Sequence, residues 1–570
     1  MYLSEVKDSI AQILKSKYLI EDPKFDVLPT QSLKDGDFYT NVALRYAKQA
    51  GKNSVDFAND LVLNLNLSSY KIEVKKPGFI NFYLTDQFFK TQIDSITSGP
   101  EKFGSFKYNS NFDPIVLEYS SPNIAKPFGV GHLRSTFIGD SLVRILRFNN
   151  AKVITDNHLG DWGTQYGKLA VAVEKWGNLD EIKKSSDPIK ILVGLYVKFH
   201  DEADKDPTLA DLGRDYFKKL EQNDPKVKEL WQFCVSVSLN EFERLYKKLG
   251  ILPFDNMLGE SFFEDKMPAV IEELKKKAII KEDKGAWLVY FDENTGLPPL
   301  MVIKKDGTTL YATRDLATDK YRFEQYGKNT QIINEVGSEQ SLYFNQLFET
   351  EKMLGWVSNG QRIHIKHGLY RLKEGKMSTR KGKNILLADI IKESETRVKA
   401  LIKDSVDLNA KEKDGLVNAV SIGALKWNDL KRESHKDIVF DWNEILNMQG
   451  NSGPYVQYTH ARCTSLMANA QLKVNNEQLK NLNIINNDER QVLRIISRFP
   501  TEVQRATNEL SPHYICHYLF NLCQTFNSFY AKHKVVGGEN EQTRLLITKS
   551  VAQVIKNGLD LLGIKAPKIM

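Results

Sequence analysis

Cysteine is scarce in this sequence, and no stretch of it is apolar over a length that would cross a bilayer. The 570 residues contain four cysteines, Cys234, Cys463, Cys516 and Cys523, with no CxxC pair and no histidine at metal-ligand spacing. A disulfide framework and a zinc site are therefore not expected. No apolar run approaches the ~20 residues of a membrane-spanning helix, so we expect no association with a membrane.

Targeting signals are also missing, and the charge is mild. Residues 1–14 mix charged with apolar side chains and contain neither a signal-peptide core nor an arginine-rich, acid-poor transit pattern. The cytoplasm is the expected compartment, although a processed organellar protein would look the same. A net charge of +7 and a pI near 8.8 predict only weak attraction to polyanions, which is compatible with an RNA partner without indicating one.

The first 105 residues have the pattern of a small α+β domain. Apolar residues recur at helical spacing over 6–14, and short alternating segments at 70–74 and 79–84 flank a Pro77-Gly78 turn. Glycine and polar residues over 99–111 then predict a linker.

Residues 112–388 open with the alternation of a parallel nucleotide-binding sheet. An apolar strand at 115–119 is followed by a glycine turn, a helix from about His132 and a second apolar stretch at 152–155. Charged helical segments from about 176 to 290 interrupt this order, and we interpret them as an insertion. Helical periodicity over 389–570 predicts an all-α bundle. The predicted fold class is α/β, with a Rossmann-type sheet, a helical insertion, an N-terminal α+β domain and a C-terminal helical bundle.

Two short segments carry the chemistry. In the first, Gly129, Gly131 and His132 stand at the strand-to-helix turn, where the backbone N–H groups of a helix start favour an anion. Packing alone also explains a glycine turn of this kind. In the second, the run from Lys376 to Gly382 has three cations that could neutralise a triphosphate, but a basic loop is also typical of plain solvated surface.

Together these segments resemble the two signatures of class I aminoacyl-tRNA synthetases, and the flanks Ser-Ser-Pro-Asn-Ile-Ala-Lys and Leu-Arg-Ser-Thr resemble the arginyl family. Gly129 replaces the first signature histidine, and Thr379 replaces the second signature lysine. Arginyl-tRNA synthetases often lack that lysine and carry one before the first signature, as Lys126 does here. The resemblance implies catalytic roles for Lys126, His132 and Lys376, and ATP binding by Gly129, Gly131, His132, Lys376 and Ser378.

The resemblance also implies an arginine site. Glu118 would pair with the α-ammonium group, while Tyr311, Asp315 and Gln340 would hold the guanidinium, for which carboxylate and phenol oxygens are suitable acceptors. The remaining implied contacts are Ser121, Pro122, Asn123 and His132. Tyr311 and Asp315 lie four apart, which is equally typical of a capped surface turn. The stretch His158 to Gly163 would border the pockets, although Trp162 could be plain core packing.

Two further groups are implied RNA contacts. Tyr455, Tyr458 and Arg462 share one helix face and could stack bases and bind phosphate, although an amphipathic core stripe would have the same spacing. The final Met570 resembles the family's ending, which packs against that surface. Phe79 and Asn81 resemble the strand that reads the tRNA elbow, and a hairpin with a half-buried aromatic is the alternative.

The implied reaction joins L-arginine to tRNA(Arg) through an arginyl-adenylate, with ATP and Mg²⁺, no zinc and a monomeric enzyme. The family usually needs bound tRNA even for the first step. A catalytically weakened synthetase-like tRNA-binding protein is the main alternative, and a nucleotidyltransferase with the same fold is another.

Overall fold

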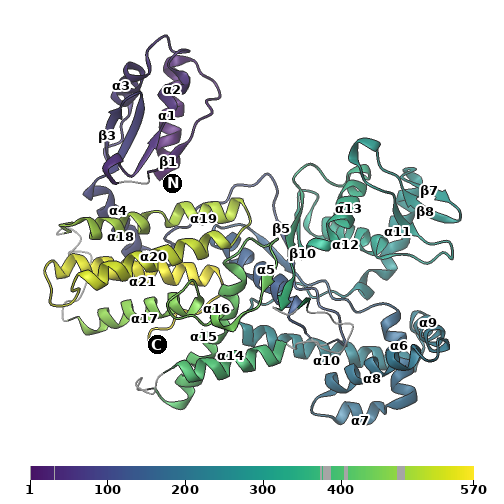
Figure 1. Ribbon diagram of the computed structural model, residues 1–570. Helices are drawn as coiled ribbons and strands as arrows, with labels where there is room; N and C mark the ends of the chain where they lie inside the picture. Colours follow the sequence, from purple (N-terminus) through teal and green to yellow (C-terminus); the bar gives the residue numbers. More distant parts are fainter. Residues whose placement is uncertain are drawn as a thin grey trace.

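The computed structural model describes residues 2–30, 33–126, 128–372, 375–376, 387–402, 408–470 and 482–570. Its N-terminal part projects from a larger body, in which a central sheet lies between a helical C-terminal region and two lobes built from the middle of the chain (Figure 1). Within these residues, no helix is long and apolar enough to span a membrane.

The N-terminal part is a four-stranded antiparallel sheet with helices packed on it. Its strand order is β1-β2-β4-β3. The predicted first helix and both predicted strands are confirmed, and Ile80, Phe82 and Leu84 alternate into the core because strand side chains point to opposite faces. The bounds are α1 (Tyr2–Tyr18), β1 (Val27–Pro29), β2 (Phe38–Thr40), α2 (Val42–Tyr46), α3 (Ser54–Asn64), β3 (Tyr70–Lys75), β4 (Phe79–Leu84) and α4 (Asp86–Ser98).

A fully parallel sheet forms the centre of the molecule, as predicted. Its order is β11-β10-β5-β6, with β5 (Ile115–Glu118), β6 (Val153–Asp156), β10 (Gln331–Gly337) and β11 (Arg362–His367). Helix α5 (Gly131–Phe148) connects β5 to β6, and the chain later returns on the other side of β5. The strand order therefore reverses between β5 and β10, and ligands of such sheets bind at the carboxyl ends of the strands at this point.

The segment between β6 and β10 contains more than the predicted helices. Its helices are α6 (Thr164–Trp176), α7 (Leu179–Lys184), α8 (Pro188–Ala203), α9 (Thr208–Glu221), α10 (Pro225–Leu249), α11 (Met267–Lys276) and α12 (Tyr311–Tyr326). A small antiparallel sheet of β7 (Ile280–Asp283), β8 (Ala286–Val289) and β9 (Leu300–Ile303) was not predicted. Its charged β7 is mostly exposed, so it lacks the apolar alternation by which a strand is recognised.

The C-terminal region is helical, with one short strand. Its helices are α14 (Leu387–Leu401), α15 (Ala410–Leu430), α16 (Trp442–Ile445), α17 (Gly453–Asn469), α18 (Asn487–Ser497), α19 (Phe499–Asn508), α20 (His513–Lys532) and α21 (Glu541–Leu561). The two-residue β14 (Ile438–Val439) pairs with β12 (Tyr370–Leu372), which also pairs with β13 (Gly375–Lys376). A strand of two residues is too short to produce an alternating pattern.

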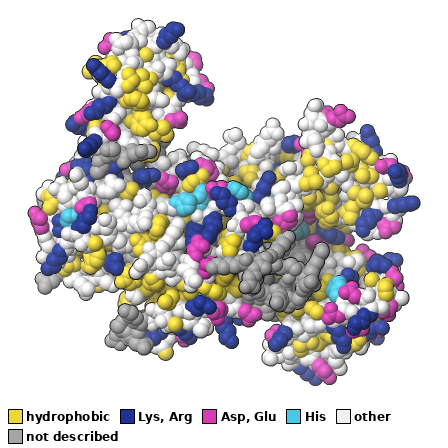
Figure 2. Space-filling view, viewed as in Figure 1, with side chains coloured by type: hydrophobic (Ala, Val, Ile, Leu, Met, Phe, Trp, Pro, Cys, Tyr) yellow, Lys and Arg dark blue, Asp and Glu magenta, His cyan; other side chains and the backbone are white. Residues whose placement is uncertain are grey.

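The remaining elements are α13 (Ser341–Met353) and five short 3-10 helices. The latter are η1 (Leu33–Asp35), η2 (Pro100–Lys102), η3 (Glu260–Lys266), η4 (Glu293–Thr295) and η5 (Ser338–Gln340). Figure 2 shows lysine and arginine side chains scattered over this face, as the mild net charge suggests, and apolar side chains gathered over the lobe that contains α11 to α13.

Candidate active site at the carboxyl edge of the sheet

The loop that follows β5 has an unusual backbone. Ser120, Ser121 and Ala125 have φ angles of 73°, 44° and 54°. Non-glycine residues in this left-handed region cost about 1–3 kcal/mol each and cluster at functional sites. The loop is held by Ser120, whose N–H donates to Ser135 Oγ at 2.8 Å and whose hydroxyl lies 2.7 Å from that of Tyr246.

A second loop, after β6, packs directly on the first. The N–H of Gly160 donates to the carbonyl of Pro122 at 3.1 Å, and Asn123 and Gly160 form a parallel bridge. A β-carbon at Gly160 would collide with Asn123 Oδ1, so a side chain there would displace the amide of Asn123. The N–H of Ser121 donates to Asn157 Oδ1 at 3.0 Å. Ser121, Pro122 and Asn123 are therefore brought against the stretch that begins at His158.

His132 is in the first turn of α5, at the edge of the sheet. The N–H of Gly129 donates to His132 Nδ1 at 3.2 Å, which leaves the ring proton of a neutral imidazole on Nε2. Burial lowers the pKa of His132, and Lys126 and His367 lower it further. His132 is thus a neutral hydrogen-bond donor beside the helix N-terminus, where an anion is favoured.

The chain on the far side of the second segment contacts the first segment. The N–H of Leu387, which begins α14, donates to the carbonyl of Phe128 at 3.1 Å. Lys376 lies on β13 opposite Arg371, but its side chain and the whole of Ser378 lie outside the described residues. The second segment therefore starts at β13, and the chain that follows it is bonded to the first segment.

Lys126 is half-buried beside this turn. Burial lowers its pKa, and Lys168 lowers it further. Within the described parts of the chain it makes no ion pair. A partly desolvated lysine of this kind is able to interact strongly with phosphate, because little water must be removed from it first.

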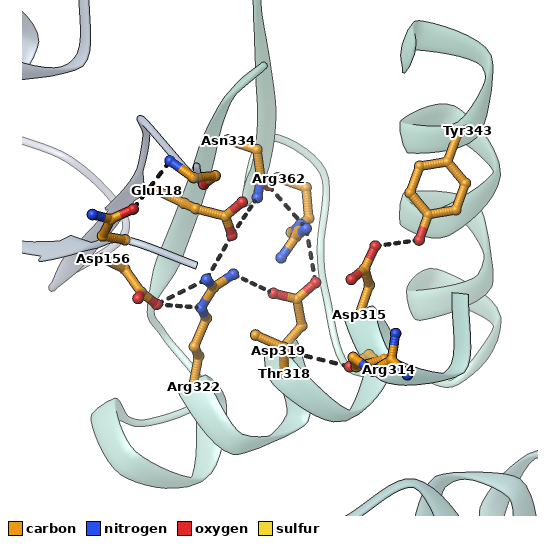
Figure 3. A network of polar contacts seen from close by, with 12 residues as sticks. Glu118, Asp156, Arg314, Asp315, Thr318, Asp319, Arg322, Asn334, Tyr343 and Arg362 are labelled. Carbon is orange, nitrogen blue, oxygen red and sulfur yellow. Dashed lines mark hydrogen bonds and ion pairs between the residues drawn. The ribbon is translucent and has the colours of Figure 1, made fainter. Parts of the chain in front are cut away.

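Glu118, at the end of β5, belongs to a buried network of charges (Figure 3). Arg322 Nη2 lies 2.6 Å from Glu118 Oε2 and 2.8 Å from Asp156 Oδ2, while Asn334 donates to the same Glu118 oxygen at 3.0 Å. Burial raises the pKa of Glu118, but the charges of Arg322 and His158 and the hydrogen bond from Arg322 together outweigh that effect, so the net shift is downward. Glu118 is therefore ionised.

The network continues behind Arg322. Asp319 lies 2.9 Å from Arg322 Nη1 and 2.9 Å from Arg362 Nη2. Burial raises the pKa of Asp319, and the two guanidinium groups reverse that effect, whereas burial holds the pKa of Glu351 well above its usual range. Burial also raises the pKa of Asp156, so Glu118 and Asp319 are the carboxylates of the cluster whose ionised form the two guanidinium groups favour.

A further carboxylate stands apart from the network. Tyr343 donates a short hydrogen bond to Asp315 Oδ2, and its ring meets that of Tyr311 edge-on at 4.7 Å. Burial raises the pKa of Asp315, and Glu118 and Asp319 raise it further while His158 opposes them. Tyr311 and Asp315 are thus together, as predicted from their spacing. Gln340 is exposed at the last residue of η5, three positions before Tyr343.

His158 lies close enough to Glu118 and Asp315 to affect both carboxylates. Its charge lowers the pKa of both Glu118 and Asp315, and its ring lies 5.6 Å from Phe263. Its Nε2 is buried and has no hydrogen-bond partner among the described residues. Trp162 of the same stretch packs edge-on against Phe217 and Trp231, which supports the core-packing alternative.

Three site residues were missed by the sequence reasoning. His158 belongs to a stretch that was noted, but it was not assigned a contact. Arg322 and Tyr343 gave no local signal, because their partners Glu118 and Asp315 lie 204 and 28 residues away. In the described part of the chain, no group of three or more histidine, cysteine or carboxylate side chains could hold a metal ion.

Family models match nearly the whole chain. The description "tRNA synthetases class I (R), catalytic domain" matches residues 99–442, "DALR anticodon binding domain" matches 456–570, and "Arginyl tRNA synthetase N terminal domain" matches 4–84. The chain belongs to the arginyl-tRNA synthetase family. It is therefore a class I aminoacyl-tRNA ligase.

Individual relatives agree with this assignment. An arginine--tRNA ligase of Clostridioides difficile is 37% identical over 579 residues, with all of both chains covered, and one of Clostridium perfringens is 39% identical over 93% of each chain. The solved arginyl-tRNA synthetase of Plasmodium falciparum matches with a TM-score of 0.82, 26% identity and coverage of 100% of this chain and 99% of that one. The Thermus thermophilus structure, at 21% identity, has the same fold, with a TM-score of 0.81 and full coverage of both chains.

In this arginyl-tRNA synthetase family member, the predicted RNA face of α17 is one physical unit. Arg462 Nη1 donates to Asn527 Oδ1 at 2.6 Å, and Asn527 Nδ2 donates to the hydroxyl of Tyr455 at 3.0 Å. The guanidinium of Arg462 also lies 4.8 Å from the ring centre of Tyr458 and 5.3 Å from that of Tyr530. The three predicted residues share one half-buried face, as expected from their spacing. Their contact with RNA stays a prediction.

The other predicted RNA contacts differ in exposure. Phe79 is half-buried and meets Tyr39 edge-on at 5.7 Å. Asn81 is 6% exposed and donates to the carbonyl of Asp35 at 2.8 Å, so its amide already serves the domain's own fold. Met570 is half-buried against the main hydrophobic core. Direct RNA contacts by these residues also stay predictions.

Proposed function

We propose that the chain activates L-arginine with ATP to arginyl-adenylate and pyrophosphate, and then transfers arginine to the 3'-terminal ribose of tRNA(Arg) with release of AMP. The observation that carries this proposal is the hydrogen bond from Leu387 to Phe128. It joins the chain after the second segment to the first segment, at the carboxyl edge where nucleotides bind to such sheets.

The ATP site is assigned to the N-terminal turn of α5 and the second segment. Among the residues that the structure describes, a β-carbon at Gly129 or Gly131 would meet nothing within 4 Å, which leaves room for phosphate at this backbone. His132 donates from Nε2, and Lys126 and Lys376 stabilise the negative charge that develops on the α-phosphate and on pyrophosphate. Ser378 completes this set by resemblance to the signature.

Magnesium is assigned to the nucleotide. Mg²⁺ is usually held by substrate phosphates with one or two carboxylates rather than by an all-protein cage. Bound with ATP, it offsets the charge of the phosphates, while Lys126 and His132 orient the α-phosphate toward the arginine carboxylate.

The arginine site is assigned to the surroundings of Asp315, Tyr343 and Tyr311, which we call the acidic pocket. Asp315 is a half-buried carboxylate whose pKa is raised by desolvation and by neighbouring carboxylates, and a guanidinium would supply the missing positive charge. Tyr311, whose ring meets that of Tyr343, and Gln340, three positions before Tyr343, are assigned to the guanidinium as well. Glu118 is assigned to the α-ammonium group, although one of its oxygens is already bonded to Arg322.

The remaining contacts complete the proposal. Ser121, Pro122 and Asn123 border the backbone part of arginine, and their strained, tightly bonded loop supports a fixed position. For RNA, the proposed contacts are Phe79, Asn81, Tyr455, Tyr458, Arg462 and Met570. The proposed units are residues 1–105 for the tRNA elbow, 112–388 for catalysis with an insertion at about 176–290, and 389–570 for the anticodon. A monomeric state and a cytoplasmic location, where translation takes place, are also proposed.

Arginine-dependent ATP–pyrophosphate exchange, run with and without tRNA(Arg), tests the function. We expect exchange with arginine and tRNA present, and none with lysine in place of arginine. Folded protein that shows no exchange with tRNA would favour the alternative of a catalytically weakened tRNA-binding protein. That alternative explains Gly129 but not the joint presence of Lys126, His132 and the acidic pocket. Exchange independent of any amino acid would instead indicate a nucleotidyltransferase.

A further inference from the structure

Lys426 on α15 is a fully buried lysine that contacts three separate parts of the chain. Its Nζ lies 2.9 Å from the carbonyl of Gly563, 3.3 Å from Asp140 Oδ2 on α5 and 3.5 Å from the carbonyl of Gly250, which follows α10. We call Lys426, Asp140 and Gly563 the tail clamp, because Gly563 begins the C-terminal tail of residues 563–570.

The tail clamp packs closely against one side of the tail, and a pocket of about 200 Å³ lined by Gly563, Ile564 and Lys565 lies beside it. Gly563 has a φ of 64°, and a β-carbon there would lie 2.6 Å from both Lys426 Nζ and Asp140 Oδ2. Asp140 is itself fixed, since it accepts hydrogen bonds from Arg144 Nε and from the N–H of Leu252, each at 2.9 Å. A displacement of the tail toward α5 would therefore displace α5 or break the clamp.

The other end of the tail lies on α17. Gln457 Nε2 donates to the carbonyl of Lys565 at 2.8 Å, and His460 Nδ1 lies 2.8 Å from the carbonyl of Pro567. Both residues belong to the helix that carries Tyr455, Tyr458 and Arg462. The tail thus connects α17 to α5, and α5 carries His132 two turns before Asp140.

Lys426 is one partner of a buried ion pair. Burial lowers the pKa of Lys426 to about 8, although Asp140 raises it, so the folded chain disfavours the charged amine that it encloses. A methionine would fill a similar volume, but removing one partner of a buried pair is commonly destabilising, because Asp140 keeps a buried charge and loses a donor. A role of Lys426 in coupling is therefore separated from its effect on stability by a control variant with a similar loss of stability. Gly563 and Gly250 would keep only carbonyl groups to be satisfied.

We propose that Lys426 is a positioning residue that transmits RNA binding on α17 to α5 through the tail. Binding at the α17 face shifts the carbonyls of Lys565 and Pro567, the tail clamp carries this shift to Asp140, and α5 moves His132 relative to the nucleotide. The inference rests on the proposed function, because the two sites it connects are the proposed RNA and ATP sites.

The substitution Lys426→Met tests the proposal. We expect a lower unfolding temperature, because Asp140 loses a partner, tRNA affinity within about twofold of wild type, and a fall of about tenfold in tRNA-dependent exchange measured below the unfolding transition. Couplings between sites commonly amount to 5–150-fold. Lys411→Met, an exposed lysine on the same helix, is the matched control and should change none of these. Leu519→Ala, a truncation of a buried side chain on α20, controls for lost stability and should keep wild-type exchange. Wild-type exchange in Lys426→Met, or an equal loss of exchange in Leu519→Ala, would overturn the proposal.

A double-mutant cycle tests the route through the tail. His460→Ala removes the contact to Pro567 at the other end. If both residues act through the tail, Lys426→Met combined with His460→Ala should lose no more exchange than the worse single variant. Losses that multiply would overturn the route.

A readout without catalysis separates this proposal from the proposed function. If wild-type protein shows no exchange, the proposed function fails. The tail clamp is then judged by hydrogen exchange of the α5 amides on addition of tRNA(Arg). Altered protection in wild type but not in Lys426→Met supports the proposal, and equal behaviour in both overturns it.

Discussion

The carboxyl edge of the central sheet and the packed pair α20 and α21 are both buried, but the first buries charged side chains and the second buries apolar ones. The edge buries Glu118, Asp319 and Arg322 beside a loop with left-handed serines. The helix pair buries apolar side chains that are 0% exposed, namely Leu519, Leu522, Phe526, Leu545, Val551, Ile555 and Leu559. Folding removes water from the charges of the first region, which costs free energy. In the second region, burial stabilises the fold by about 25 cal/mol for each Å² of apolar surface removed from water.

This difference separates stability from function. An apolar helix interface tolerates substitutions that keep its volume. A buried ionic network depends on every partner, because removal of one leaves the others desolvated and unpaired. Positions that bind a charged substrate therefore lie in the region that tolerates fewer substitutions. The apolar helix pair contributes stability that offsets the cost of burying those charges.

The largest expected effect is on the network. Arg322→Met should lower the free energy of unfolding by about 3–5 kcal/mol, because Glu118, Asp156 and Asp319 stay buried after the guanidinium is removed. The first transition in chemical denaturation measures this. Arg498→Met is the control, since its pair with Glu502 is partly exposed and surface pairs contribute about 0–1 kcal/mol. A loss below about 1 kcal/mol for Arg322→Met would remove the contrast between the two regions.

In the helix pair, Leu519→Ala should cost about 3 kcal/mol of stability. Leu519 packs against Gly558, where a β-carbon would lie 2.7 Å from its side chain. Because the site is in another region, the KM for arginine should stay within about twofold of wild type, measured in the exchange assay below the unfolding transition. A large rise in the KM for arginine with normal stability would contradict the separation of the helix pair from the substrate site.

Within the acidic pocket, Asp315→Ala should raise the KM for arginine by about 100-fold and the KM for ATP by less than about threefold. The reason is that a guanidinium would lose its charged partner, a loss of about 2–5 kcal/mol. Tyr343→Phe should have a smaller effect, since it removes only the hydroxyl that orients Asp315. Steady-state exchange kinetics measure both constants. Equal losses for arginine and ATP would refute the assignment of Asp315.

The smallest expected effect is at Gly129. A side chain there meets no neighbour, so Gly129→His should fold normally and, by adding a donor near the phosphates, raise the exchange rate by up to about tenfold. Gly139→Ala on α5 is the contrasting control, because its β-carbon would collide with the ring of Tyr119 and the substitution should destabilise the protein. A lower rate in stable Gly129→His would show that glycine itself is needed.

Local patterns predicted most of the elements that build the site. The strand ending at Glu118, the helix starting near His132 and the shared face of Tyr311 and Asp315 all follow from spacing over fewer than about twenty residues. Arg322 was not predicted, because its role depends on Glu118, 204 residues away. The β7–β9 sheet was missed since its β7 is exposed and charged rather than alternating. The family resemblance, not periodicity, supplied the roles of Lys126 and Lys376.

The strained loop after β5 has a consequence for directed evolution. Ala125 adopts a φ of 54°, a conformation in which glycine avoids a penalty of about 1–2 kcal/mol. Selection for heat resistance alone would therefore favour glycine at this position. Selection for rapid aminoacylation would favour the alanine, since a more flexible chain beside Lys126 would hold the nucleotide less firmly. A library screened for both properties should show them moving in opposite directions at this single residue.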